Sequence, residues 1–257
     1  VLLALPDAKL SVGRIVSRDS PGVPRFSATL VRGALFVGAI VLLAGVPGEN
    51  TLDLNRALIY GTLLLSLVLL TGYSGQISLA QYVFFGLGAF AMGKVAGGDS
   101  LLGMGAAAAI AVPLGVITAL PAMRLQGLYL ALVTFALAQV SRDVIFQDTR
   151  TFGAGPVAVG RLEVLGVSFE SNRSFALLCG IVFTLVAIGV LALRRGGFGR
   201  RLAAMRDSQA ACATLGLDVR RTKLTVFMLS SAIAGLAGAL YGGLGFSASQ
   251  LQFEPLL

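Results

Sequence analysis

The 257-residue sequence has no histidine and no tryptophan, and only two of its residues are cysteines, Cys179 and Cys212. The absence of histidine removes the commonest metal ligand and the commonest general base of enzymes. The two cysteines lie in an apolar run and in a basic segment, with neither C-x-x-C spacing nor a disulfide framework, so we interpret both as free thiols. No metal site and no catalytic residue is predicted, and the lack of an acidic pair further disfavours a membrane-embedded enzyme.

Charge is scarce as well. Asp, Glu, Lys and Arg make up 12% of the residues, against about a quarter in a typical soluble domain, and the mean hydropathy is +0.87. The net charge is +8, but the positive side chains cluster at the ends of apolar runs and form no basic face with interleaved aromatics. The composition therefore predicts an all-α, polytopic transmembrane bundle in contact with membrane lipid, and it disfavours a nucleic-acid partner.

Seven apolar runs approach the length of about 20 residues that a membrane-spanning helix needs. We expect spans at Leu30–Val46, Ala57–Gly72, Ile77–Ala96, Leu101–Leu120, Leu125–Val140, Phe175–Leu193 and Leu224–Phe246. Residues 1–29 are cationic and contain Pro21 and Pro24 among their basic residues, so we interpret them as a cytoplasmic basic linker before a transmembrane domain at 30–257. Both ends of the sequence are interpreted as cut from a longer polypeptide.

The segment 194–223 orients these spans. It carries eight Lys or Arg residues against two Asp, and so cationic a loop beside a span stays on the cytoplasmic side. Counting spans backwards places residues 141–174 and Asp99 outside, and Arg124, residues 72–76 and the N-terminal segment inside. Every strongly cationic loop then lies on one face of the membrane.

Within this basic segment, residues 200–215 are predicted to form a helix, with Gly216 as its C-terminal cap. Helical spacing gives it one softer stripe, formed by Leu202, Met205, Gln209, Cys212 and Leu215. Such a short amphipathic helix can lie on the membrane or fit a groove in a partner protein, and the spacing favours neither.

Polar residues interrupt the apolar runs at two places. Residues 72–78, with the sequence GYSGQIS, predict either an unwound helix that lines a cavity or a tight turn between two spans. Tyr129, Thr134 and Gln139 are polar side chains in the fifth run, where they either bond a neighbouring helix or contact cargo. A P-loop-like pattern at 88–95 ends in Val95 in place of Ser or Thr and lies inside an apolar run, so its glycines indicate close helix packing and no nucleotide site.

Three blocks of the sequence resemble, in order, the permeases of branched-chain amino acid ABC importers, specifically the LivM type. These are TGYSGQISLAQYVFFGLGAF at 71–90, RLQGLYLALVTFALAQV at 124–140 and GRRLAAMRDSQAACATLGLDVRRTKLTVFMLSSAIAGLAGALYG at 199–242, and TFGAGP at 151–156 resembles the external glycine-rich turn of that family. The chain is interpreted as a LivM-type subunit, possibly the C-terminal half of a fused LivH–LivM protein.

The resemblance implies a multi-pass subunit of the bacterial cytoplasmic (inner) membrane that imports Leu, Ile and Val. It implies two ATP-binding subunits that bind and hydrolyse ATP, a second permease of the LivH type or a fused half, and an extracytoplasmic substrate-binding protein. The chain itself would be no enzyme and would carry no cofactor.

The same resemblance implies that the coupling helix that docks into an ATPase groove lies in the segment 194–223. Its expected residues are Arg206, Asp207, Gln209, Ala211, Cys212 and Gly216, although Gln209 stands where the family commonly has Glu and Cys212 replaces an Ala. For the cargo path we expect Tyr73, Gln76, Ser78, Tyr129 and Thr134.

Other transport functions stay open. A permease for urea or short-chain amides shares these blocks, because a separate binding protein filters the cargo first. An ion-coupled secondary transporter is disfavoured, because no Asp or Glu lies in the middle of a span. A scaffold that transports nothing is disfavoured by the patterned basic segment, which favours a moving partner.

Overall fold

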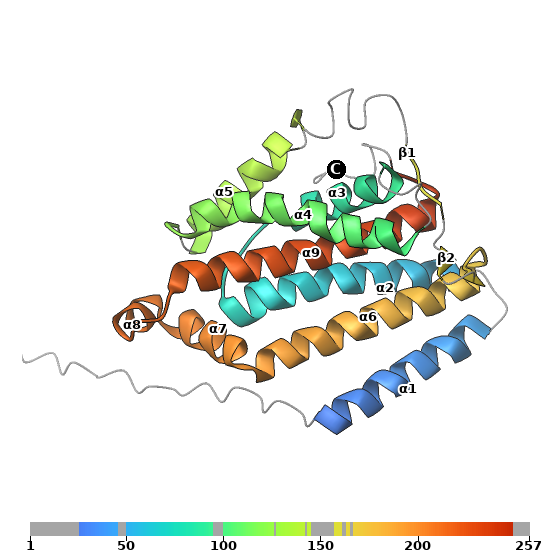
Figure 1. The fold of residues 1–257 in the computed structure, drawn as a ribbon, viewed down its shortest axis with the longest axis horizontal. Helices are drawn as coiled ribbons and strands as arrows, with labels where there is room; N and C mark the ends of the chain where they lie inside the picture. Colours follow the sequence, from blue (N-terminus) through green and yellow to red (C-terminus); the bar gives the residue numbers. More distant parts are fainter. Residues whose placement is uncertain are drawn as a thin grey trace, which may run out of the picture.

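The computed structural model describes residues 26–45, 50–94, 100–125, 127–141, 143–144, 157–160, 163–164 and 167–248. These residues form an elongated bundle of helices (Figure 1), so the predicted all-α polytopic fold is confirmed. Most of the predicted linker at 1–29 and the glycine-rich turn at 151–156 lie outside the described residues.

Each predicted apolar run contains a helix, although the run at Ile77–Ala96 is helical only from Gln81 to Lys94 among the described residues. The helices are α1 (Phe26–Gly45), α2 (Asn50–Leu67) continued by the π-helical turn η1 (Val68–Tyr73), α3 (Gln81–Lys94), α4 (Leu101–Ala122), α5 (Gly127–Ser141), α6 (Asn172–Arg195), α7 (Gly197–Asp207), α8 (Gln209–Thr214) and α9 (Val219–Gly245). Among the described residues, four helices are long and apolar enough to cross a membrane, at Thr51–Tyr73, Leu101–Ala122, Asn172–Arg195 and Val219–Gly245. The apolar helices at Val31–Leu43 and Gly127–Ser141 are shorter.

The prediction of a continuous helix at Ile77–Ala96 is wrong. The chain leaves the helical path after η1, and α3 begins only at Gln81. Gly75 adopts a positive φ of 70°, which an L side chain disfavours, and the Ser78 hydroxyl accepts a hydrogen bond from the Ala80 amide just before α3. At 14 residues, α3 is about 21 Å long and falls short of the hydrocarbon core of about 30 Å.

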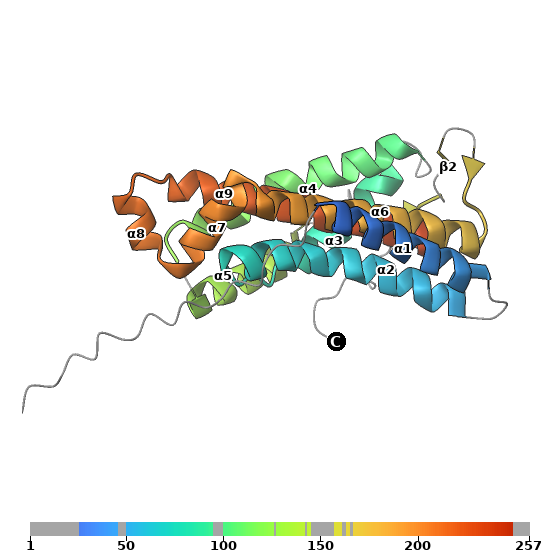
Figure 2. The ribbon, with the colours of Figure 1, turned by 90° about the horizontal axis from the view of Figure 1, so that it is seen from below.

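Long-range hydrogen bonds bring together helix ends that the predicted alternation places on the same face of the membrane. At one end, Arg206 of α7 bonds the carbonyl of Gly72, Lys223 of α9 bonds Ala122, and Arg195 of α6 bonds Thr29 near the start of α1. At the opposite end, the Asn55 side chain of α2 bonds the backbone of Asn172 at the start of α6. We call the first of these the basic end, because it carries α7 and α8 and most of the described arginines (Figure 2).

Two short β-ribbons, which the sequence does not predict, lie at the opposite end. β1 (Val157–Ala158) pairs antiparallel with β4 (Ser247–Ala248), and β2 (Glu163–Val164) pairs antiparallel with β3 (Val167–Ser168). The first ribbon fastens the loop after α5 to the residues that follow α9.

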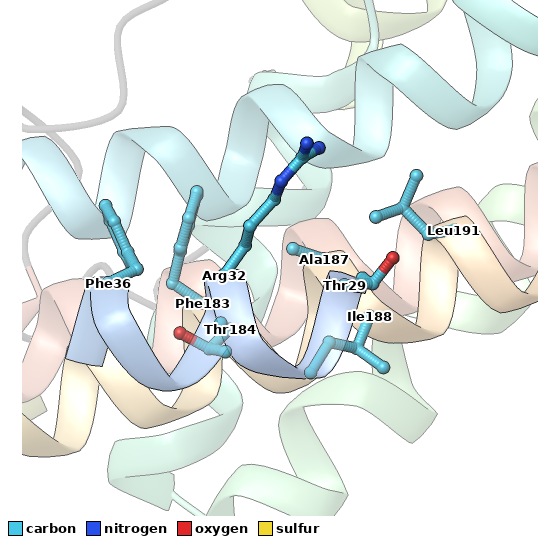
Figure 3. Close-up of a pocket in the computed structure, with 9 residues that line it drawn as sticks. Thr29, Arg32, Phe36, Phe183, Thr184, Ala187, Ile188 and Leu191 are labelled. Atoms are coloured by element: carbon cyan, nitrogen blue, oxygen red, sulfur yellow. The ribbon is translucent and has the colours of Figure 1, made fainter. Parts of the chain in front are cut away.

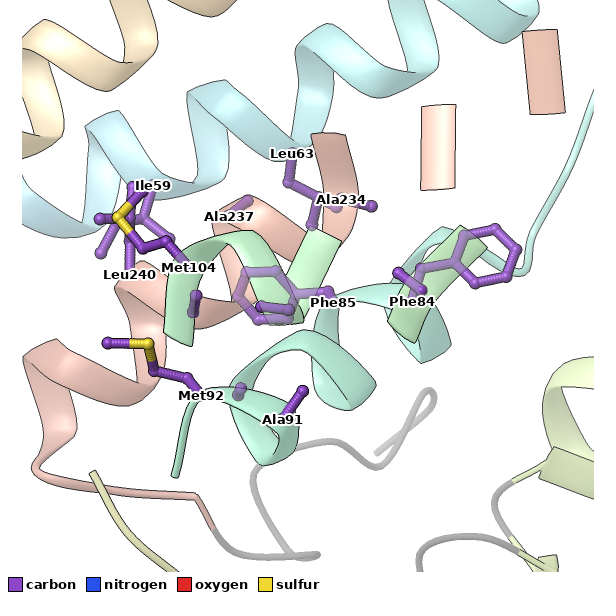
Figure 4. Packing of buried hydrophobic residues seen from close by; sticks show 14 of the residues in the cluster. Ile59, Leu63, Phe84, Phe85, Ala91, Met92, Met104, Ala234, Ala237 and Leu240 are labelled. Atoms are coloured by element: carbon purple, nitrogen blue, oxygen red, sulfur yellow. The ribbon is translucent and has the colours of Figure 1, made fainter. Parts of the chain in front are cut away.

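Helix α9 is the centre of the bundle. It contacts α4, α3 and α2, and the main core packs Phe84 and Phe85 of α3 with Met104 of α4 and Leu240 of α9 (Figure 4). Glycines let these helices approach closely: a Cβ atom at Gly238 would overlap the Phe85 carbonyl. Gly88, in the P-loop-like pattern, lies directly on the Gly235 backbone, so the interpretation as close helix packing is confirmed.

Helix α1 lies at the edge of the bundle, where it packs on α6. A shallow cavity of about 190 Å³ separates the two helices near the basic end and is lined by residues such as Arg32, Phe36, Phe183 and Ile188 (Figure 3). The outer face of α1 is apolar and exposed, with Leu42 75% exposed, as expected for a helix that meets lipid.

Candidate functional site

The break between η1 and α3 is the most irregular backbone among the described spans. The π-helical turn buries Leu69 and Leu70, and the chain then runs without helical structure to Gln81. Two bonds close the turn, from the Gly75 amide to the Thr71 carbonyl and from the Gln76 amide to the Leu70 carbonyl, each 3.2 Å. π-Helical turns inside longer helices often mark functional sites.

The segment after the turn alternates in burial, as an extended chain does. Ser74, Gln76 and Ser78 are buried, whereas Ile77 and Leu79 are 44% and 53% exposed. The backbone from Gly75 to Ala80 is not helical, so the segment is unwound, as the first of the two alternatives that the sequence left open describes. Its polar side chains point into the bundle and its apolar side chains point out of it.

The inward polar row is incompletely bonded. The Gln76 amide nitrogen donates to the Ser74 hydroxyl at 3.2 Å, and Ser74 donates in turn to the Leu70 carbonyl. The Gln76 Oε1 atom is buried and has no hydrogen-bond partner among the described residues. An unbonded buried amide oxygen carries a desolvation cost of about 1–3 kcal/mol, which a ligand that donates a hydrogen bond would remove.

The other residues expected on the cargo path lie at different distances from this row. The Thr134 hydroxyl on α5 accepts a hydrogen bond from the Leu79 amide at 3.0 Å, so it anchors the unwound segment. Tyr73 ends the π-helical turn, and the Arg194 guanidinium lies 5.4 Å from the centre of its ring. Tyr129 is 73% exposed on the surface of α5. The structure thus brings Tyr73, Gln76, Ser78 and Thr134 to one segment and leaves Tyr129 outside it.

A buried polar network that sequence reasoning missed lies just beyond the break. Gln81, the first residue of α3, accepts from the Ser66 hydroxyl of α2 at 3.0 Å and donates to the Ser230 hydroxyl of α9 at 3.1 Å. Ser230 donates to the Ser66 carbonyl at 2.9 Å. Single polar residues inside apolar runs were the available signal, but nothing in their spacing indicates that they meet.

The prediction of one helix at 200–215 is wrong, because Ser208 divides it into α7 and α8. Ser208 has extended backbone angles, and its hydroxyl accepts the Ala211 amide as the N-cap of α8. The predicted cap at Gly216 is confirmed: its φ is +78°, and the Leu217 amide closes the turn onto the Cys212 carbonyl at 3.0 Å.

The soft stripe of this segment packs on the bundle itself. Leu202, Met205 and Cys212 are buried in a second core with Leu69 and Leu70 of η1. The same core contains Leu130 of α5 and Val226 and Phe227 of α9. Leu215, which the spacing placed on the stripe, is 81% exposed. Leu202, Met205 and Cys212 therefore join the basic helices to the π-helical turn, while Leu215 stays on the outer surface.

Arg206 makes the closest link between these two parts. Its Nη1 atom donates to the Gly72 carbonyl at 2.6 Å, and its Cγ atom would be 3.0 Å from a Cβ atom at Gly75. Because the side chain lies over both glycines, any larger residue at Gly75 would displace it. A movement of α7 therefore reaches the break through this side chain as well as through the packing of Leu202 and Met205 on the π-helical turn.

The remaining coupling residues point elsewhere. Asp207, Ala211 and Gly216 are exposed, and Gln209 is half-buried. Together with Leu215 they form the outer surface of the α7–α8 unit, facing away from the bundle. Two of the six expected coupling residues, Arg206 and Cys212, thus contact the bundle, and Asp207, Ala211 and Gly216 are exposed on the outer surface.

Comparisons with known proteins agree with this architecture. The chain is 26% identical, over an alignment of 256 residues, to the high-affinity branched-chain amino acid transport system permease protein LivM of Escherichia coli K12. It is 25% identical to the protein of the same name from Salmonella typhimurium LT2, and each alignment covers 85% of this chain but 59% of the relative. No solved structure matches the chain. Residues 53–254 match the family described as branched-chain amino acid transport system / permease component, and the chain belongs to that family of multi-pass membrane proteins.

Proposed function

We propose that the chain is a permease subunit of an ATP-driven importer that moves leucine, isoleucine and valine across the bacterial cytoplasmic membrane. Membership of the permease family and the names of both relatives support this cargo. The observation that carries the mechanism is the bond from Arg206 to Gly72, because it joins a helix pair outside the spans to an unwound segment inside them.

ATP hydrolysis belongs to other subunits in this proposal. Two ATP-binding subunits sit at what is then the cytoplasmic face, and one of them docks on the outer surface of α7–α8, around Ala211, Leu215 and Gly216. A second permease of the LivH type, or a fused half, completes the channel, and an extracytoplasmic binding protein delivers the cargo at the opposite end.

Coupling follows from the second core. Leu202 and Met205 of α7 pack against Leu69 and Leu70, so a displacement of α7 presses on the π-helical turn directly. Packed cores switch between discrete arrangements instead of deforming continuously. ATP-driven closure of the docked subunits would therefore move the unwound segment as a unit and change access to its polar row.

The polar row fits the backbone groups of an amino acid. Ser74 and Ser78 supply hydroxyls, and Gln76 supplies an amide oxygen that has no partner among the described residues and suits an ammonium group. Discontinuous spans of this kind place substrate sites near the middle of the membrane in other transporters.

Uptake of labelled leucine tests the function. Cells that lack the full-length gene are compared with cells complemented by the wild type, by Gln76→Leu and by Gln139→Leu, a control at a half-buried glutamine of α5. We expect the wild type and the control to restore uptake, valine and isoleucine to compete, and Gln76→Leu to raise the leucine concentration needed for half-maximal uptake. Unchanged leucine uptake on deletion of the gene, with urea uptake lost, would replace the cargo with urea or a short-chain amide.

A further inference from the structure

A second feature of the basic end is a hollow where the end of α4 meets the start of α9. The cavity has a volume of about 630 Å³. Its walls are Leu120, Pro121, Met123, Arg124, Leu125 and Arg220. The lining thus combines an apolar wall with two guanidinium groups, and it takes no part in the coupling path through Arg206.

The two arginines are uncompensated. Neither the Arg124 guanidinium nor the Arg220 guanidinium has a hydrogen bond or an ion pair within the described part of the chain. Asp218, the acid nearest to Arg220 in sequence, is engaged by the Arg221 Nε atom at 2.9 Å and by the Arg221 amide. No acidic side chain lines the cavity.

Further positive charge lies beside the hollow. Lys223, one helical turn after Arg220, is 2% exposed, and its ammonium donates to the Ala122 carbonyl at 2.6 Å, two residues before Arg124. The start of α9 also carries the positive end of a 27-residue helix, where basic side chains are unfavourable unless an anion is near. The electrostatics of this corner therefore favour a bound anion.

An apolar track leads away from the hollow along α4. Leu120, Ile117 and Ile110 are 55%, 50% and 36% exposed. The rise from Leu120 to Ile110 is about 15 Å, which is close to half of the hydrocarbon core of about 30 Å. The track is as long as the acyl region of one leaflet, and it starts at the two arginines.

We propose that this corner binds an anionic phospholipid of the cytoplasmic leaflet. The phosphate of the headgroup lies between Arg124 and Arg220, and an acyl chain follows Leu120, Ile117 and Ile110. Basic pockets between spans on this side of a membrane are suited to such headgroups. If the two arginines served only to set the membrane topology, their positive charge would be explained. The cavity and the apolar track along α4 would not be explained. The inference needs only the membrane orientation, so it does not depend on which cargo the subunit carries.

Lipid retention tests the site. The full transporter is purified in mixed phosphatidylglycerol and phosphatidylcholine, and the retained lipids are counted by native mass spectrometry. The variant Arg124→Gln/Arg220→Gln is compared with Arg200→Gln/Arg201→Gln, which removes the same charge from the exposed surface of α7. Each arginine contributes about fivefold to the preference for the anionic lipid. We therefore expect Arg124→Gln/Arg220→Gln to lower this preference roughly 30-fold and Arg200→Gln/Arg201→Gln to leave it unchanged.

Three results would overturn the inference. Equal losses in both double variants would mean a general effect of surface charge. Displacement of the lipid by millimolar inorganic phosphate would assign the cavity to a soluble anion. Loss of the ATP-binding subunits from the cavity variant, with lipid retention unchanged, would assign it to a protein contact. If the double variant does not fold, the single variants Arg124→Gln and Arg220→Gln test the site instead, because each should lower the preference for the anionic lipid about fivefold.

Discussion

Replacing Arg206 by alanine should separate ATP hydrolysis from transport. The guanidinium of Arg206 spans the gap between α7 and the Gly72 carbonyl, and nothing else on α7 bonds the residues of the break in the described structure. The substitution removes this bond while leaving Leu202 and Met205 buried below it. The α7–α8 unit should therefore still fold and bind its partner, but it should move the break less effectively.

The size of the effect follows from the exposure of the bond. A hydrogen bond from a charged group is worth about 1.5–3 kcal/mol when it is shielded from water. The Arg206 side chain is exposed, so we reduce the value to about 1 kcal/mol. That free energy corresponds to about a fivefold change in the equilibrium between the joined and separated states of α7 and the break.

The assay is leucine uptake per ATP hydrolysed by the transporter reconstituted in proteoliposomes. We expect the ratio to fall about fivefold in Arg206→Ala, with near-normal ATPase activity. Arg206→Lys, which keeps one charged donor but lacks the fork of the guanidinium, should give an intermediate ratio. Arg200→Ala is the matched control, since Arg200 is exposed on the same helix and lines no part of the break. An unchanged ratio in Arg206→Ala would refute the proposed coupling path.

Three further substitutions test the fold and the docking surface. Gly238→Leu would drive a side chain into the Phe85 backbone and should destabilise the protein by about 3 kcal/mol or more. Gly105→Leu, with open space around the new side chain, should not. Equal thermal unfolding temperatures of the two variants in detergent would contradict this. Gly216→Trp should abolish uptake while membrane insertion stays normal, because it strains the positive-φ turn that ends α8 and blocks the outer surface there; full uptake at equal expression would count against docking there. Gln81→Leu should cost about 1–3 kcal/mol by leaving its serine partners unbonded, and denaturant unfolding that matches the wild type would show that the network is dispensable.

The sequence predicted the bounds of a helix best where a single apolar run is flanked by polar or charged residues. The runs at 101–120, 125–140 and 175–193 became α4, α5 and α6 with ends shifted by at most three residues, because hydrophobic length alone specifies a span. The order of the spans was also predictable, since the positive charges lie at one end.

The sequence was ambiguous where local chemistry allows two conformations. Gly72 and Gly75 permit both a turn and an unwound segment, and only the packing of Ser74, Gln76 and Ser78 into the bundle selects the second. A serine in a helical pattern can either continue the helix or cap the next one, and the Ser208 hydroxyl does the latter.

The spacing of apolar residues in a helix does not show which part of the molecule they contact. The spacing of Leu202, Met205 and Cys212 revealed a soft face, but their contacts with Leu69 and Leu70 depend on tertiary structure. The same limit applies to Arg206, which the sequence assigned to an ATPase surface. Its bond to Gly72 crosses 134 residues of sequence, and no local signal reports a contact of that range.

A reversible cross-link between α7 and the break tests the central claim most directly. A Cβ atom at Gly75 would lie 3.6 Å from the Cβ atom of Arg206, within the range of about 3.5–4.5 Å that a disulfide requires. The pair Gly75→Cys/Arg206→Cys is introduced after the buried Cys179 and Cys212 have been replaced by alanine. Because the break must move relative to its resting contact, we predict that oxidation stops leucine uptake and that reduction restores the uptake that the same double variant shows before oxidation. Equal uptake in the fully cross-linked and the reduced protein would contradict the account.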